Sequence, residues 1–329
     1  MNDGAAQDAA LAADRPAAPA RRAGSARRTA SIVRMAALAA LIAVALATPG
    51  FTAAPSLLAL VTTMSFIGCV AVGMTLVTIS GNIMAFCFGA TVAASAIVFA
   101  AALPLGFVLA AAIALGFGAV VTGLQGLVIG SVRANPIIVS IAVLALIYGI
   151  GQSVTGSESI YLDRNGPQTA IRGKIAGVPV EFVLFLAVVA TGQFLLSFTR
   201  FGRHVYMVGA SARAAEAAGL RVWRTVTGTY LWAGLFVAVP GILLAARYGS
   251  ANMEYGLGYD YDAIAAVLVG GTPIHGGEGS VLRTLAGVAI IATVQVLVLL
   301  HGVRQEWQYL ITGLIVLFVI MLHTVEGRR

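Results

Sequence analysis

The feature that most constrains this chain is an uncharged stretch that runs from Met35 to Val132. Neither Asp, Glu, Lys nor Arg occurs there, and charged residues are only 10% of the sequence, against about 25% in soluble domains. A water-soluble domain cannot leave so much chain uncharged, whereas a membrane-crossing helix needs about 20 apolar residues. The apolar runs are continuous rather than alternating, which argues against a β-barrel. The sequence therefore predicts an all-α, polytopic membrane protein.

The apolar runs, divided by the length that one span needs, give about ten transmembrane helices. The second and eighth runs are weak or interrupted by glycine, which predicts that either of them is broken or re-entrant. The ten segments lie near 34–50, 56–80, 84–102, 104–130, 136–153, 180–199, 226–246, 261–275, 281–301 and 306–323.

The distribution of basic residues predicts the orientation of these spans. If the N-terminus is cytoplasmic, the inner segments hold 15 Lys and Arg and the outer segments hold five. Cytoplasmic loops of membrane proteins carry the excess of basic residues. Ten spans with both termini in the cytoplasm fit this rule. The rule also accounts for the formal charge of +7, so that charge gives no reason to expect nucleic-acid binding.

The chain divides into a membrane domain and two tails. Residues 1–33 are rich in Ala, Arg, Asp and Pro, which predicts a disordered basic cytoplasmic tail. Residues 34–325 form the predicted transmembrane domain, and 326–329 form a cytoplasmic tail. A signal peptide cleaved near residue 47 is the alternative for the N-terminus, but the polar region before it is unusually long.

One polar, arginine-rich insert, residues 200–225, separates two long apolar runs. Inside it Ser211 is a candidate helix N-cap and Gly219 a candidate C-terminal stop, with alanines between them. A helix of about eight residues does not hold together alone in water. The insert therefore predicts a short cytoplasmic helix that docks on a partner protein.

The sequence shows no apparatus for catalysis. Its one lysine, Lys174, is followed by Ile175, so a Gly-Lys-Ser/Thr phosphate-binding loop is absent. Neither a Ser-His-acid pattern nor His and Cys at metal-ligand spacing is present. Cys69 and Cys87 lie in apolar segments, which is typical of small buried side chains. We therefore expect no catalytic residue, no metal site and no cofactor on this chain.

Several polar side chains fall in or near apolar segments. Asn82, Asn252 and Gln295 are candidates for lining a transport pathway, although an interhelical hydrogen bond or a loop position is the alternative for each. Asp260 and Asp262 stand at the start of an apolar helix. Capping of that helix is the simpler interpretation, and a proton relay is the alternative.

Five motifs resemble the permeases of ABC sugar importers of the ribose/xylose/arabinose group, and the resemblance covers about 45–323. It is most specific after residue 200. The motifs are Phe201–Gly209, Ala214–Leu220, Gly258–Val267, Gly270–Leu282 and Trp307–Leu314.

The resemblance implies a function and a set of partners. It implies a permease in the bacterial inner membrane that works with a second permease chain, identical or different. Cytoplasmic ABC ATPase subunits would bind and hydrolyse the ATP, and a periplasmic substrate-binding protein would deliver a sugar or sugar-like solute. It also implies that the ATPase-coupling residues are Arg213, Ala214, Ala215, Glu216 and Gly219.

One segment departs from the family pattern. The family often has an acidic residue followed by Leu-Ser after the glycines of the second span, whereas Ser80–Gly89 has apolar side chains there. The solute is therefore left open. A proton-coupled secondary transporter that uses Asp260 or Asp262 is the alternative function. Uptake that survives loss of the ATPase but stops with an uncoupler would favour it.

Overall fold

The computed structural model describes residues 41, 43–82, 85–163, 166, 171, 173–175, 177–302, 307–308, 310–315 and 317. Both predicted tails and about half of the residues in the first and last apolar segments lie outside these residues. Within them, seven helical segments are long and apolar enough to cross a membrane. They are α3 (Ala54–Ile79), α4 (Phe88–Ala102) with a 3-10 turn to Leu105, α5 (Phe107–Val132), α6 (Pro136–Thr155), α7 (Val180–Phe198), α10 (Val222–Tyr248) and α12 (Val281–Leu300).

These seven helices fall on seven of the ten predicted segments. The second segment, expected to be weak, is the continuous 26-residue helix α3, so the prediction of a break there is wrong. The eighth segment contains α11 (Tyr259–Val269), whose 11 residues rise only about 16 Å. That is about half of a hydrocarbon core of roughly 30 Å. The count of ten stays a prediction.

Helix α10 forms the centre of the bundle and packs closely on α3, α4 and α5. The close approach to α5 depends on small residues that recur every fourth position and so share one helix face. A Cβ at Gly118 would lie 2.7 Å from the carbonyl oxygen of Gly234 on α10. The small residues on this face of α5 are Gly118, Thr122, Gly126 and Gly130.

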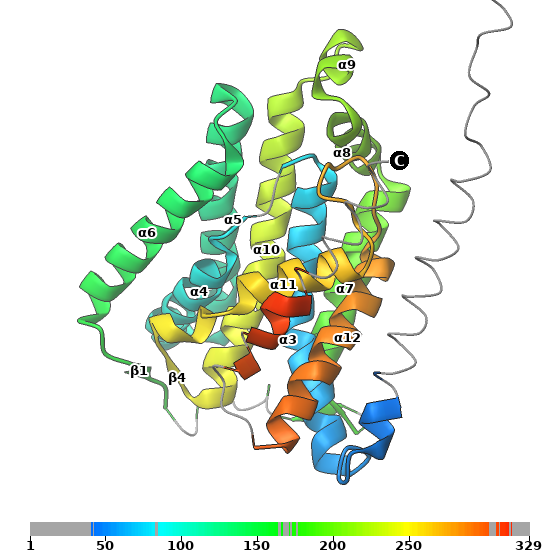
Figure 1. Ribbon diagram of the computed structural model, residues 1–329. Coiled ribbons are helices and arrows are strands. Elements are labelled where there is room, and N and C mark those ends of the chain that lie inside the picture. The colour runs from blue at the N-terminus through cyan, green and yellow to red at the C-terminus, as the bar shows by residue number, and fades with distance from the viewer. Residues whose placement is uncertain are drawn as a thin grey trace, which may run out of the picture.

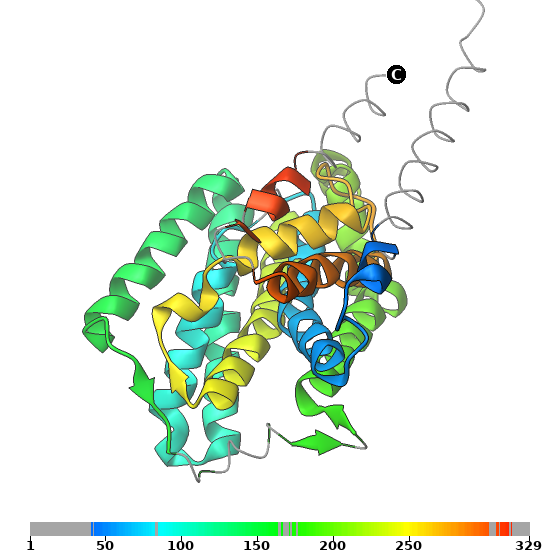
Figure 2. The same ribbon diagram turned by 60° about the horizontal axis from the view of Figure 1, so that its bottom comes forward.

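The bundle has two different ends (Figure 1). One carries α8 (Arg200–Ala210) and α9 (Ala212–Ala217), and we call it the α9 end. The other carries two antiparallel strand pairs (Figure 2), and we call it the β1–β4 end. The pairs are β1 (Ile160–Tyr161) with β4 (Ser250–Ala251), and β2 (Lys174–Ile175) with β3 (Val178–Pro179).

Two elements depart from a simple up-and-down bundle. Helix α11 and the 3-10 turn before it, η3 (Met253–Gly256), cross the middle of the bundle obliquely (Figure 1). Helix α11 packs on α12 and α3. Helix α6 lies at the edge of the bundle (Figure 2). Only 11% of the residues in its apolar 18-residue stretch are buried inside the protein.

Candidate functional site

The arginine-rich insert folds as two short helices, and the predicted helix is α9. Its N-cap is Ser211, whose hydroxyl oxygen accepts a hydrogen bond of 3.2 Å from the backbone N–H of Ala214. At the other end Gly219 has a φ of +83°, and its N–H donates to the carbonyl of Glu216 over 2.8 Å. A left-handed glycine just after a helix satisfies its last carbonyls. The predicted cap and stop are both confirmed.

The predicted coupling residues divide into a buried and an exposed set. Ala215 is buried against the bundle, whereas Arg213, Ala214 and Glu216 are exposed. Glu216 forms a bidentate ion pair with Arg133, with Nη2 at 2.7 and 2.8 Å from its two carboxylate oxygens. Arg133 begins the connection from α5 to α6. This pair therefore ties that connection to α9.

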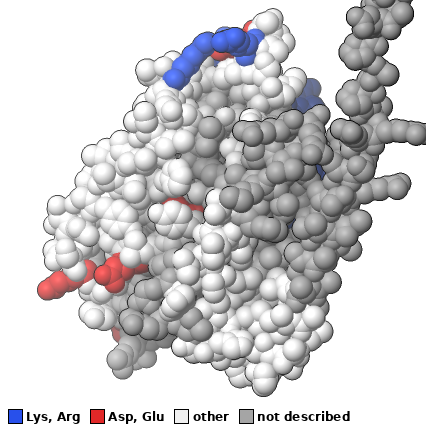
Figure 3. Space-filling view, in the orientation of Figure 1, with Lys and Arg blue, Asp and Glu red and all other residues white. Residues whose placement is uncertain are grey.

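A groove of about 410 Å³ lies beside this ion pair, between the end of α5 and the start of α10. Its charged and aromatic lining residues are Arg133, Glu216, Arg221 and Trp223. Figure 3 shows Lys and Arg gathered at the α9 end and acidic residues near the β1–β4 end. Sequence reasoning missed Arg133 as a partner of Glu216, because 83 positions separate them. The sequence feature that could have drawn attention to Arg133 is its position as the first charged residue after the uncharged stretch.

The end of α8 joins this surface to the core of the bundle. Gly209 lies so close to the last turn of α3 that a Cβ there would overlap the carbonyl oxygen of Ile79. The same carbonyl accepts a hydrogen bond of 2.8 Å from the N–H of Gly277, in the loop between α11 and α12. The Tyr206 hydroxyl donates to the carbonyl of Gly279 over 2.8 Å. Partial burial raises the pKa of Tyr206.

These contacts bring three separate segments to one junction, which we call the glycine junction: the end of α3, the end of α8 and the loop 276–279. The loop turns tightly, because Gly276, Gly277 and Gly279 all have positive φ, which glycine adopts without steric cost. The end of α8 is therefore in direct contact with two segments that are distant from it in the sequence.

The three predicted pathway residues do not form one site. Asn82 is buried near the glycine junction and donates to the hydroxyl of Ser80 over 2.8 Å. Asn252 caps η3 at the opposite end of the bundle and donates to the hydroxyl of Ser159 over 3.2 Å. Both side chains form structural hydrogen bonds within the protein, Asn82 with a neighbour in sequence and Asn252 with a residue 93 positions away, as the alternative interpretation expected. Gln295 lines a large cavity.

Asp260 acts as a cap, but for a helix other than its own. Helix α11 has Gly258 at its N-cap, without a side-chain hydrogen bond. The Asp260 carboxylate instead accepts a hydrogen bond of 2.7 Å from the N–H of Gly89, in the first turn of α4. Both aspartates do lie in the first turn of α11, next to the positive end of the helix dipole, but the hydrogen bond of Asp260 goes to α4. Asp262 lies 3.5 Å from the hydroxyl of Thr312.

Removing the carboxylate of Asp260 is expected to destabilise the protein. In Asp260→Leu the N–H of Gly89 stays buried without an acceptor, which costs about 1–3 kcal/mol. Asp260→Asn keeps an acceptor oxygen and is the matched control, with a loss expected below that of the leucine variant. Thermal unfolding in detergent measures both, and equal unfolding temperatures for the two variants would contradict this assignment.

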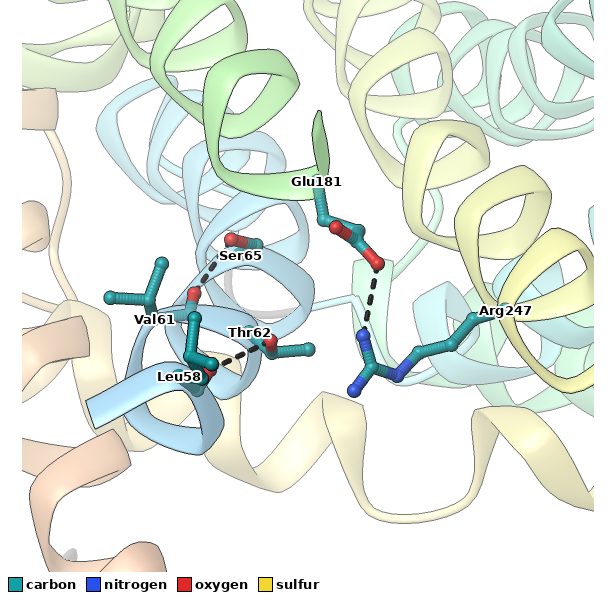
Figure 4. Close-up of polar contacts among 6 residues, drawn as sticks. All are labelled: Leu58, Val61, Thr62, Ser65, Glu181 and Arg247. Atoms are coloured by element: carbon teal, nitrogen blue, oxygen red, sulfur yellow. Dashed lines mark hydrogen bonds and ion pairs between the residues drawn. The ribbon is translucent and has the colours of Figure 1, made fainter. Parts of the chain in front are cut away.

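A partly buried ion pair connects α7 to α10 near the β1–β4 end. Glu181, in the first turn of α7, accepts a hydrogen bond of 2.9 Å from Nη1 of Arg247, in the last turn of α10. Figure 4 shows the pair facing the turn of α3 that carries Thr62 and Ser65. Sequence reasoning missed this pair, because its members are 66 positions apart. The sequence feature that could have suggested the pair is that Glu181 and Arg247 each stand at the end of an apolar run.

Comparison with known proteins gives a family and several relatives. The family model described as "Branched-chain amino acid transport system / permease component" matches residues 56–320. The ribose import permease protein RbsC of Bacillus subtilis is 34% identical over 282 residues, which cover 83% of this chain and 86% of RbsC. No solved structure matches this chain.

Two further relatives come from Escherichia coli. The probable ABC transporter permease protein YphD is 35% identical over 55% of this chain and 54% of its own length. The galactose/methyl galactoside import permease protein MglC is 32% identical over 64% of this chain and 65% of its own length. The aligned part of this chain thus spans less than two thirds of either relative.

The family match and the apolar helices both indicate a membrane protein. Seven apolar helices in the described residues make the chain a multi-pass membrane protein, and its permease relatives place it in the bacterial inner membrane. With a family model that covers residues 56–320 and a relative 34% identical over 83% of its length, the chain belongs to the permease family described as branched-chain amino acid transport system / permease component, which includes the sugar ABC import permeases.

Proposed function

We propose that this chain is the transmembrane permease subunit of an ABC importer, which moves a small polar solute, a sugar or a sugar-like molecule, into the cytoplasm. Separate cytoplasmic ABC ATPase subunits bind and hydrolyse the ATP. A periplasmic substrate-binding protein delivers the solute, and a second permease chain, identical or different, completes the membrane unit. The relatives named as ribose and galactose import permeases support this proposal.

One observation carries the proposal: the exposed helix α9 is joined to the core through α8 and the glycine junction. Arg213, Ala214 and Glu216 are exposed on α9, where an ATPase subunit would bind them. Behind them α8 contacts the end of α3 and the loop 276–279. Residues 200–225 thus join an exposed surface to helices that cross the membrane.

The charges support a cytoplasmic position for the α9 end and therefore for both termini. The exposed basic residues at this end outnumber the acidic ones, which is the pattern of a cytoplasmic face. Among the described residues they are Arg133, Arg200, Arg203, Arg213, Arg221, Arg224 and Arg283, with Glu216 and Glu278 as their acidic neighbours.

In the proposed mechanism, ATP binding draws the ATPase subunits together and displaces α9. Helix α8 transmits this movement to α3 and to the loop before α12, because Gly209, Ile79 and Gly277 are in direct contact. Packed interfaces change between discrete arrangements rather than deforming continuously. The solute pathway would then open to one side of the membrane at a time, and Gln295 is the proposed pathway residue that lines a cavity.

The proposal is tested by asking whether solute uptake is driven by ATP hydrolysis or by a proton gradient. Radiolabelled D-ribose and D-galactose are offered to cells or proteoliposomes that contain the complete importer. Uptake is expected to fall to background when the ATPase subunit is replaced by a hydrolysis-deficient variant, and to continue when an uncoupler removes the proton gradient while ATP is maintained. Uptake that persists without ATP hydrolysis and stops with the uncoupler would contradict the proposal and favour proton coupling through Asp260 or Asp262.

A further inference from the structure

A cavity of about 730 Å³ lies between α3, α10, α11 and α12 in the half of the bundle toward the β1–β4 end. Sites for small molecules commonly measure about 300–1,000 Å³. Polar and ionisable side chains within a membrane domain are costly and concentrate at functional positions. The polar and charged lining residues include Thr62, Thr63, Arg247, Glu254, Asp262 and Gln295.

Arg247 presents hydrogen-bond donors to this cavity. Its side chain is 41% exposed, whereas that of Glu181 is only 3% exposed. A guanidinium carries five N–H donors in a fixed plane, and the bond to Glu181 uses one of them. Glu181 therefore balances the charge of Arg247 and holds its orientation, and the other donors remain accessible. Thr62, on the same wall, donates to the carbonyl of Leu58 and keeps its lone pairs free as acceptors.

Gln295 lies beside one of the carboxyl groups of the lining. Its side chain is nine-tenths buried and lines the same cavity, close to the carboxyl group of Asp262. The amide nitrogen itself is closed off from the cavity. Gln295 therefore helps to place the carboxyl group of Asp262 and offers no donor to a solute.

The charges of the lining select among solutes. Glu181 neutralises Arg247, and the lining also carries two carboxyl groups, those of Glu254 and Asp262. An anionic solute would therefore be repelled, while a neutral solute rich in hydroxyl and ether oxygens can accept hydrogen bonds from Arg247 and donate hydrogen bonds to the acidic groups.

We infer that this cavity is a solute-binding vestibule for a neutral, oxygen-rich small molecule, in which Arg247 donates hydrogen bonds to the solute and Glu181 is the positioning residue for Arg247. The inference rests on the proposed function for the direction of transport. On that orientation the vestibule lies in the periplasmic half of the membrane, where a binding protein releases its solute.

A cysteine reporter tests the vestibule without any partner protein. In Thr63→Cys the new thiol lies in the cavity wall, while Cys69 and Cys87 are fully buried. Charged methanethiosulfonate reagents are expected to modify it, the cationic one at least three times faster than the anionic one. Arg247→Gln should widen this preference, whereas Lys174→Gln, which removes a charge at the same end outside the cavity, should not. A thiol inert to both reagents would overturn the inference.

Protection by solutes tests the binding step. A panel of neutral pentoses and hexoses, including D-ribose and D-galactose, is expected to slow modification at least threefold, and ribose 5-phosphate is not. Protection should be lost in Arg247→Gln and Glu181→Leu, and retained in Glu181→Gln, which keeps the acceptor oxygen. Absence of protection by every sugar, or equal protection in Arg247→Gln, would overturn the vestibule. These readouts do not involve ATP, so they can fail while ATP-driven uptake succeeds, and the reverse.

Discussion

Reversing the charge of Glu216 is expected to abolish ATP-driven uptake while the protein still inserts and folds. In Glu216→Arg the bidentate pair with Arg133 becomes a repulsion between two guanidinium groups. The exposed α9 surface also loses its carboxylate. Because both side chains are partly exposed, at 73% and 39%, the pair stabilises the fold by no more than about 1 kcal/mol. We expect uptake and ATPase stimulation below a tenth of wild type, with unchanged yield and unfolding temperature.

Two control variants separate the causes of this loss. Glu158→Arg makes the same change at an exposed position of the β1–β4 end and should leave ATPase stimulation intact. The double variant Arg133→Glu with Glu216→Arg restores an ion pair of opposite polarity. If Glu216 contacts the ATPase, this swap fails to restore uptake, and if it acts only through Arg133, uptake returns. Deletion of Ala214–Gly219 should abolish uptake in every background, and normal uptake after that deletion would contradict the coupling role of α9.

Replacing Gly209 with alanine is expected to disconnect α9 from the membrane helices. The new Cβ would overlap the carbonyl oxygen of Ile79 and lie 2.6 Å from the nitrogen of Gly277. Both are backbone atoms, so no side-chain rotation can relieve the contact, and α8 must move away from α3. Overpacking of this kind costs about 1–3 kcal/mol. We expect a lower unfolding temperature and uptake near background, measured with the wild-type ATPase and binding protein.

The matched control for this variant is Gly149→Ala in α6. A Cβ there meets no atom of the described residues within 4 Å, and alanine favours a helix interior by about 0.5–1 kcal/mol over glycine. This variant should be as stable as wild type or slightly more so. Full uptake and full stability in Gly209→Ala would contradict the assignment of the glycine junction as the connection between α9 and the core.

The parts of this structure that sequence predicted well depend on neighbouring residues. Helix α9 begins after Ser211 and ends before Gly219, because a hydroxyl N-cap and a left-handed glycine act within one or two turns. Seven of the apolar segments are helices for a similar reason, since span length follows from bilayer thickness. Composition and local order were sufficient for both.

The parts that sequence could not predict depend on packing between distant segments. The carboxylate of Asp260 meets the N–H of Gly89, 171 positions away. The sequence around Asp260 does not show that its carboxylate caps α4 rather than α11. Asn252 was grouped with Gln295 because both are polar and near apolar runs. In the fold Asn252 caps a 3-10 turn, while Gln295 faces a cavity. The two residues differ in the direction in which their side chains point, and a single sequence does not show that direction.

The most direct test of the central claim is the side of the membrane on which α9 lies. Arg213 is exposed on α9, so Arg213→Cys can be labelled with a membrane-impermeant maleimide, with the buried Cys69 and Cys87 as a low background. If α9 meets an ATPase in the cytoplasm, we expect labelling in inside-out vesicles and protection there by the ATPase subunit, with none in intact spheroplasts. Labelling of this cysteine from the periplasmic side of intact spheroplasts would contradict that position.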